Sequence, residues 1–178
     1  MYSVIIWRIF SSTSSTLATS VKRYGISLQA TRYPSSPGVI KNEILEIMKE
    51  AKEKHYTPKL APETIGKINV FGSVEEIASL VKQTGCEFCI DFAHILAREK
   101  KIDYELIEKS FPQKKWHVHF SGIEYGEKGE KRHKRTDEEE LKNLLKNLPR
   151  NRDITIINES PEPVGDSILG LKLYKMDT

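Results

Sequence analysis

Four strand-like stretches of the sequence each deliver an acidic or imidazole side chain near their carboxyl end. Glu63 ends the stretch PKLAPE, Asp91 ends EFCID, and Glu159 ends DITIINE. The stretch KWHVHF carries His117 and His119, which share one face of a strand because they are two residues apart. If these strands run parallel in one sheet, their carboxyl ends meet at one edge, where parallel barrels assemble their active sites.

Several carboxylates at one such edge predict a divalent metal ion. Carboxylates that converge in a low-dielectric site repel one another and are costly to desolvate unless a cation joins them. Glu, Asp and His together supply the mixed oxygen and nitrogen ligands that Zn²⁺ or Mn²⁺ accepts. Each residue also has an ordinary structural reading: Glu63 could lie in a surface turn, and Asp91 could cap the helix that begins near Phe92. The four equivalent positions together favour the metal site.

The remaining histidines and cysteines carry weaker signals when each is taken alone. His94 would lie in the first turn of a helix, and His133 in a polar loop with the sequence GEKRHKR. Cys86 and Cys89 form a C-x-x-C pair, but no second pair follows at zinc-ribbon spacing, which favours buried structural thiols. The sequence has neither a G-x-S-x-G nucleophile elbow nor a P-loop, so those two chemistries have no support.

The elements that must position these residues are those of an α/β fold. Helical and strand patterns alternate after residue 38 with short connections, which is typical of parallel strands joined by helices. A doubly wound sheet would usually show a glycine-rich first turn, G-x-G-x-x-G, and the sequence has none. We therefore predict a partial (β/α) TIM-type barrel with parallel strands.

Several helix starts can be predicted from capping residues. Ser73 with Glu76 forms a capping-box pattern, and so does Thr136 with Glu139. Asp166 can start a terminal helix.

Composition divides the chain into two unlike parts. Residues 1–38 include thirteen Ser or Thr and no acid, whereas 24 of the 28 basic residues and all 25 acidic ones lie in residues 39–178. An acid-free, Ser-rich leader has the signature of an organellar transit peptide, but no amphipathic Arg face supports it, and an irregular leader is the preferred reading. The nearly neutral body limits any nucleic-acid binding to local patches.

Two cysteines in 178 residues cannot build a disulfide scaffold, so a reducing compartment, the cytoplasm, is the expected location, with an organelle as the alternative. No window approaches the roughly 18 apolar residues of a membrane span, so no membrane partner is expected.

Four ordered motifs, LAPETIGK, CIDFAH, WHVHFSGIEYGEKGEKRH and INESP, resemble the endonuclease IV family of apurinic/apyrimidinic endonucleases. The likeness is closest to its archaeal-type branch, and it runs from about Val39 to the end of the chain. The resemblance implies membership of the xylose-isomerase-like TIM-barrel group, up to three bound zinc ions, and double-stranded DNA with abasic sites as the substrate. The implied activity is hydrolysis of the DNA backbone 5′ to the abasic site.

The resemblance also implies roles for individual residues. Glu63 corresponds to a carboxylate that bridges two metals, and with Glu159 it would be catalytic. The other residues that correspond to family ligands are Asp91, His117 and Glu159 for the second metal and His94 and His133 for the third.

The chain departs from the family pattern at two of these positions. The family has an acid two residues before the histidine that corresponds to His133, where this chain has Lys131, and Glu130 could substitute. His117 matches its motif by register, and His119 is a second candidate for the same role.

The largest departure lies upstream of Glu63. The family's first metal needs two histidines from earlier strands, and only His55 precedes Glu63 here. A complete barrel of this type needs about 250 residues, so the opening strands are expected to be missing and fewer than three metals to bind. A second copy of the chain could then cover the open sheet edge.

Two alternative functions remain open. A sugar isomerase or epimerase of the same superfamily would need only one metal, held by the Glu, Asp, His, Glu set. A truncated, non-catalytic remnant would explain the missing histidines.

Overall fold

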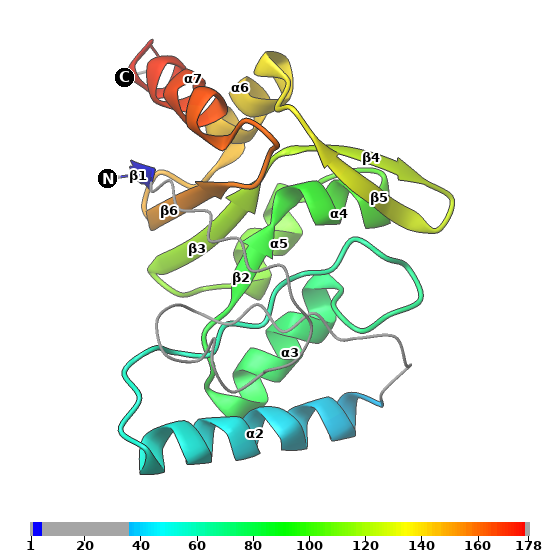
Figure 1. Cartoon of the computed structure of the whole chain (residues 1–178), viewed down its shortest axis with the longest axis vertical. Helices are drawn as coiled ribbons and strands as arrows, with labels where there is room; N and C mark the ends of the chain where they lie inside the picture. The colour runs from blue at the N-terminus through cyan, green and yellow to red at the C-terminus, as the bar shows by residue number, and fades with distance from the viewer. Residues whose placement is uncertain (1, 5–35, 177–178) are drawn as a thin grey trace.

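The computed structural model describes residues 2–4 and 36–176 of the chain (Figure 1). The helices are α2 (Pro37–Glu53), α3 (Val74–Thr84), α4 (Phe92–Glu99), α5 (Tyr104–Ser110), α6 (Glu138–Asn147) and α7 (Pro163–Met176). The strands are β1 (Tyr2–Val4), β2 (Cys89–Asp91), β3 (Lys115–Phe120), β4 (Gly122–Gly126), β5 (Gly129–Lys134) and β6 (Asp153–Asn158).

The main sheet has the strand order β1-β6-β3-β2, and each neighbouring pair is parallel (Figure 1). Glu63 adds an isolated parallel bridge to Cys89 on the outer side of β2. Four parallel segments therefore lie side by side in chain order: the segment at Glu63, β2, β3 and β6. The strand order does not reverse among them, as it would in a doubly wound sheet. This winding confirms the predicted partial α/β barrel.

The stretch PKLAPE was predicted to be a strand, and the structure shows only the single bridge at its end. Pro58 and Pro62 have no N–H group to donate to a ladder, which limits the pairing of this stretch. The carbonyl of Pro62 still accepts the N–H of Cys89 at 2.9 Å, so Glu63 remains aligned with β2.

The helix starts agree with the predicted caps in part. The Ser73 and Glu76 capping box is present at the start of α3. The N-cap of α6 is Asp137 instead of the predicted Thr136, because the Asp137 carboxylate accepts two backbone N–H groups of the first turn. The prediction for α7 is wrong, since this helix begins at Pro163 and encloses Asp166, which accepts the N–H of Thr136 at 2.8 Å.

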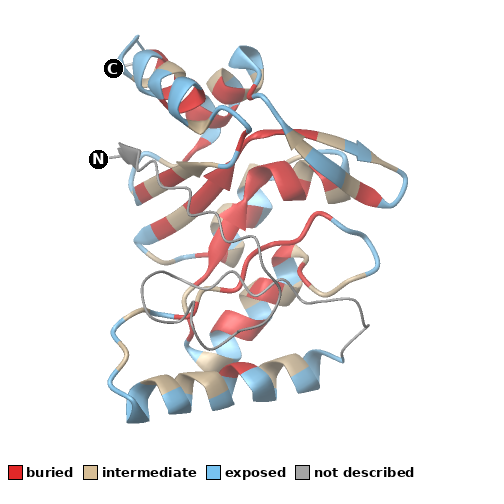
Figure 2. Ribbon diagram, in the orientation of Figure 1, coloured by how far each residue is buried: buried red, intermediate tan, exposed pale blue. Residues whose placement is uncertain are grey.

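One face of the main sheet packs into the apolar core, and the opposite face is left for polar side chains. In β3, Trp116, Val118 and Phe120 are buried in the core, with the helices packed around it (Figure 2). His117 and His119 alternate with them and point to the other side. The alternation thus separates the residues that stabilise the fold from those that could carry chemistry.

Of the predicted leader, residues 1–38, the structure describes residues 2–4, which form β1, and residues 36–38. The backbone of β1 pairs with β6. Helix α2 begins at Pro37, next to the predicted boundary after residue 38. The remainder of residues 1–38 lies outside the described residues, so their character as a leader stays a prediction.

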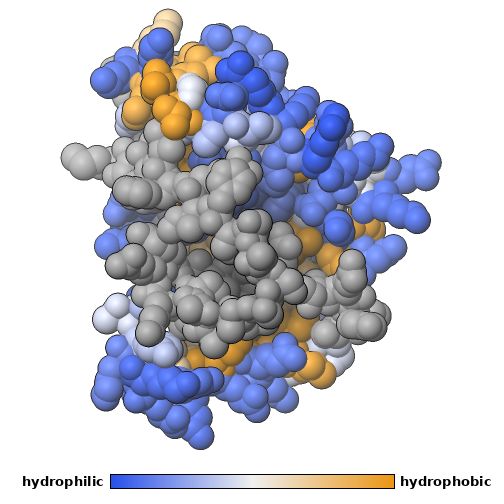
Figure 3. Space-filling model, viewed as in Figure 1, coloured by the Kyte–Doolittle hydropathy of each residue, from blue (hydrophilic) through white to orange (hydrophobic). Residues whose placement is uncertain are grey.

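Helix α7 presents an apolar face to solvent. Val164, Ile168 and Leu171 are exposed along it, and apolar side chains gather over this helix at the upper left of Figure 3. An exposed apolar patch is a common mark of a contact surface, and the predicted second copy of the chain stays a prediction. Of the described helices, none combines the length and the apolar character that crossing a membrane requires.

Gly129 fixes the approach of the β4–β5 hairpin to the segment after Glu63. Its φ is +91°, and a Cβ atom there would lie 2.0 Å from the carbonyl oxygen of Gly66. We expect Gly129→Ala to lower the free energy of unfolding by about 1–3 kcal/mol, measured by chemical denaturation. Gly38→Ala is the matched control, because nothing lies within 4 Å of its added Cβ. Equal losses in both variants would contradict this role for Gly129.

Candidate metal centre

Asp91 stands at the junction of β2 and α4 and has two roles available to it. Its Oδ1 atom accepts the N–H of His94 at 2.8 Å, which is the predicted N-cap. Its Oδ2 atom is buried and has no hydrogen-bond partner in the described structure. A buried carboxylate oxygen without a donor is costly unless a cation meets it. The capping reading is therefore confirmed, and the second oxygen, which lies 3.5 Å from His94 Nδ1, accepts no hydrogen bond from the described residues and could also bind a metal.

Asp91 and His119 are paired across the β2–β3 ladder, which places their side chains next to each other. Glu63 approaches from the bridge beside β2, and Glu159 follows β6. The Nδ1 atom of His119 lies 3.1 Å from Glu63 Oε1 and 3.2 Å from Glu159 Oε1. One ligand atom from each of these four residues lies within 4.8 Å of the others. We call Glu63, Asp91, His119 and Glu159 the carboxylate group.

The donor set of the carboxylate group fits a single divalent ion. Three carboxylates and one imidazole are the ligand types of Zn²⁺ or Mn²⁺ sites. Glu63, Asp91 and His119 are buried, whereas Glu159 is exposed, so the group opens to solvent on the side of Glu159. Within the described part of the chain, the Oδ2 atom of Asp91 accepts no hydrogen bond and has an ion-pair contact of 3.5 Å with His94 Nδ1, so it can turn to a cation in this group.

Burial and neighbouring charges shift the pKa values of two members of the carboxylate group. Burial raises the pKa of Asp91 to about 7, with the nearby Glu63 adding to the shift and His94 and His119 opposing it. Burial disfavours the charged form of His119, but the hydrogen bond and charge of Glu63, with Glu159 and Asp91, overcome it and raise the pKa of His119 to about 9. A divalent ion that binds here would have to displace these protons.

His117 lies beside the carboxylate group and outside it. Its Nε2 atom is 3.0 Å from the Nε2 atom of His119, so His119 separates His117 from the carboxylates. Burial and the adjacent His119 lower the pKa of His117 to about 4, which keeps this imidazole neutral. The motif register named His117 as the ligand and His119 as a second candidate, and the geometry favours His119. Sequence alone could not decide, because both histidines share one face of β3.

His94, Glu130 and His133 form a neighbouring cluster. His94 Nδ1 lies 2.9 Å from the carbonyl oxygen of Thr64, its Nε2 atom lies 3.0 Å from Glu130 Oε2, and its ring centroid lies 5.4 Å from that of His133. Among the described residues, these three do not form a group in which all ligand atoms lie within 4.8 Å. Their assignment to a third metal stays a prediction.

The β4–β5 hairpin places His133 differently from the sequence prediction, and it brings Glu130, the predicted substitute acid, to His94. His133 lies on β5 and not in a loop, and its Nδ1 atom is 2.6 Å from Ser121 Oγ. Glu130 lies on the same strand, and its carboxylate faces His94. It is therefore placed to supply the acid that the family has at the position of Lys131. The prediction missed the strand because every residue from Glu130 to Lys134 is polar, which hides the alternation that marks a strand.

Two supporting residues were not identified from the sequence. Thr64 accepts the Asp91 N–H on its Oγ1 atom at 2.9 Å, and its carbonyl oxygen faces the ring of His94. Ser121 holds the ring of His133. Their only sequence signal is their place beside Glu63 and after the histidines of β3.

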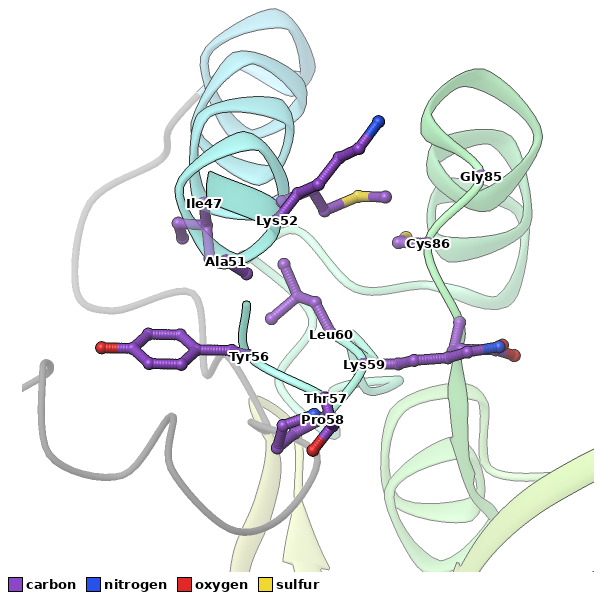
Figure 4. A pocket seen from close by; sticks show the side chains of 12 residues that line it. Ile47, Ala51, Lys52, Tyr56, Thr57, Pro58, Lys59, Leu60, Gly85 and Cys86 are labelled. Atoms are coloured by element: carbon purple, nitrogen blue, oxygen red, sulfur yellow. The ribbon is translucent and has the colours of Figure 1, made fainter. Parts of the chain in front are cut away.

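A separate pocket of about 320 Å³ lies between the end of α2 and the segment before Glu63 (Figure 4). Its walls include Ile47, Tyr56, Leu60 and Cys86, and a Lys59–Glu87 ion pair of 2.6 Å lies at its edge. The carboxylate group does not line it. We therefore do not assign the chemistry of the chain to this pocket.

Comparisons with known proteins agree with this architecture. The chain is 34% identical over 153 residues to the uncharacterized protein MJ0133 of Methanocaldococcus jannaschii, a match that covers 76% of this chain and 55% of that protein. Its fold is similar to the crystal structure of SacUVDE, with a TM-score of 0.56, 17% sequence identity, and coverage of 79% of this chain and 47% of that one. No protein-family model matches the chain. The chain thus spans about half the length of the proteins that it resembles.

Proposed function

We propose that the chain is a metal-dependent DNA-repair endonuclease that hydrolyses the phosphodiester 5′ to abasic sites in duplex DNA, as the endonuclease IV family does. The observation that carries this proposal is the carboxylate group at the carboxyl edge of a parallel sheet. The similarity in fold to SacUVDE, a UV damage endonuclease, supports a nuclease of this architecture.

The residues of the carboxylate group would bind the metal ion and hold it near the DNA. Glu63, Asp91, His119 and Glu159 would hold the ion, Zn²⁺ or Mn²⁺. A bound divalent ion would stabilise charge on the phosphate and lower the pKa of water. Glu159 lies at the exposed side of the group and would be the ligand nearest to the DNA.

The β4–β5 hairpin and its end offer a local basic surface for the DNA backbone. The exposed cations of this segment are Lys128, Lys131 and Lys134, together with Arg132 and Arg135, which are ion-paired with Glu124 and Asp166. Lys and Arg bind phosphates without reading sequence, which suits an enzyme that recognises damage. The hairpin also carries His133 and Glu130, so DNA bound along it would pass close to the candidate metal centre.

A nicking assay tests the proposed function. We expect the chain loaded with Zn²⁺ or Mn²⁺ to cut a duplex that contains one abasic site, on the 5′ side, and to lose the activity with a chelator. Glu159→Gln should reduce cutting at least tenfold through lost metal affinity, whereas Glu162→Gln, an exposed neighbour outside the group, should not. An intact abasic duplex after incubation with the metal-loaded chain would contradict the proposal. If the chain cuts UV-irradiated duplex but leaves the abasic duplex intact, the proposed substrate would change from an abasic site to a UV lesion.

A sugar isomerase or epimerase is the second candidate. It is favoured by one observation: among the described residues, the carboxylate group is complete, whereas His94, Glu130 and His133 do not bring their ligand atoms together. Conversion of an aldose to a ketose by the metal-loaded chain, with no cutting of abasic DNA, would establish this alternative. If the metal-loaded chain shows neither DNA cutting nor sugar isomerisation, this result would favour the non-catalytic reading.

A further inference from the structure

Cys89 lies on the same face of the main sheet as the imidazoles of His117 and His119, the face opposite the apolar core. Cys89 is paired with His117 across the parallel β2–β3 ladder, and neighbouring strands lie about 4.8 Å apart. His119 is two residues beyond His117 and points to the same side. The sulfur of Cys89 and one ring nitrogen from each histidine all lie within 4.8 Å of one another. We propose that Cys89, His117 and His119 form a second metal site, specific for a zinc-like divalent ion and adjacent to the carboxylate group.

The donor chemistry of this second site differs from that of its neighbour. A thiolate and two imidazoles form a sulfur- and nitrogen-rich set that suits Zn²⁺ and Co²⁺, whereas carboxylates suit harder ions such as Mn²⁺. Three protein ligands leave one tetrahedral position open. His117 is only half-buried, so that position can be reached from solvent.

The two imidazoles already stand close to ligand geometry. Their Nε2 atoms lie 3.0 Å apart. Two nitrogens bound to one tetrahedral zinc at about 2.0–2.1 Å lie about 3.3 Å from each other, so the rings need to open by only about 0.3 Å. His119 presents its other nitrogen, Nδ1, to Glu63 and Glu159. One imidazole therefore lies between the two sites, with one nitrogen facing each.

Charge balance supports two ions. Glu63, Asp91, Glu159, a Cys89 thiolate and a His119 imidazolate that binds through both nitrogens would supply five negative charges in one partly buried space, of which two divalent ions would neutralise four. A buried thiol is ordinary by itself. Cys89 differs from Cys86 in having two imidazoles beside it on the same face of the sheet. Cys86 lines the pocket of Figure 4 and belongs to neither group of ligands.

Cobalt substitution tests this site without DNA. We expect the Co²⁺-loaded chain to show a thiolate-to-cobalt charge-transfer band in the near ultraviolet. Cys89→Ser should abolish the band, whereas Cys86→Ser, which removes the other buried thiol, should retain it. Far-ultraviolet circular dichroism would check that each variant is folded. A metal-loaded wild-type chain without the band, or a band that persists in Cys89→Ser, would overturn the proposal.

Two further variants keep both thiols and therefore do not depend on how the core tolerates serine. His117→Gln should weaken Co²⁺ binding at this site at least tenfold and diminish the band. Glu159→Gln should leave the band intact, because Glu159 belongs only to the carboxylate group. The reverse pattern, a band lost with Glu159 and unaffected at His117, would show that no separate site exists. Since no readout uses cutting of DNA, the site and the nuclease activity can fail independently.

Discussion

Asp91→Asn is expected to lower the affinity for Zn²⁺ or Mn²⁺ on the order of 100-fold while stabilising the metal-free chain at pH 8. The Asp91 side chain is fully buried, and burial raises its pKa to about 7. Because the folded-state pKa lies above the unfolded value, the associated stability is present below about pH 4 and is lost as the pH rises through 7. At pH 8 the buried charge costs on the order of 2–4 kcal/mol, and the amide removes this cost.

The measurements for Asp91→Asn are urea denaturation with a chelator present and calorimetric titration with the metal. Asp103→Asn is the matched control, because Asp103 also caps a helix, through the N–H of Leu106 at 3.0 Å, but is exposed. Asn and Asp are similar caps, so this control should change neither quantity by much. A metal-free Asp91→Asn chain that is less stable than wild type, with unchanged metal affinity, would reduce Asp91 to a helix cap.

Metal affinity is expected to fall steeply as the pH falls from 9 to 6. Burial opposes the charge on His119, but the hydrogen bond to Glu63 and the surrounding carboxylates raise its pKa to about 9, so below pH 9 a metal must displace this proton. Affinity should therefore fall about tenfold per pH unit between 9 and 7. Below pH 7 the decline should approach about 100-fold per unit, because Asp91 is then protonated as well.

Titration with Mn²⁺ at several pH values measures this dependence. In Asp91→Asn, the steeper decline below pH 7 should disappear, whereas the decline between pH 9 and 7 should remain. An affinity that does not change between pH 9 and 7 would exclude His119 as a ligand and would return His117 to consideration.

The sequence was most informative where local chemistry determines structure. Ser73 with Glu76 predicted the start of α3 because capping depends on residues within one turn. Asp91, as the last residue of β2, was identified as a cap and as a candidate ligand, and the structure gives its two oxygens separate surroundings. The partial barrel followed from the alternation of helices and strands, since each parallel strand needs a helical crossover.

The remaining features depend on contacts between distant segments. The choice of His119 over His117 rests on its pairing with Asp91, which no local pattern encodes. The β4–β5 hairpin escaped prediction because its second strand is polar, and its anchor in the fold is the packing of Ile123 against Ala93 and Ala97 of α4. The prediction of buried thiols at Cys86 and Cys89 agrees with the structure, but the two imidazole neighbours of Cys89 come from another strand and could not be foreseen.

The most direct test of the candidate metal centre is a crystal structure of the zinc-loaded chain with anomalous diffraction at the zinc edge. We predict an anomalous peak bounded by Glu63, Asp91, His119 and Glu159, with a ligand distance from each of about 2.0–2.2 Å. A zinc-loaded, folded chain with no peak among these four side chains would contradict the metal centre on which the proposed function rests.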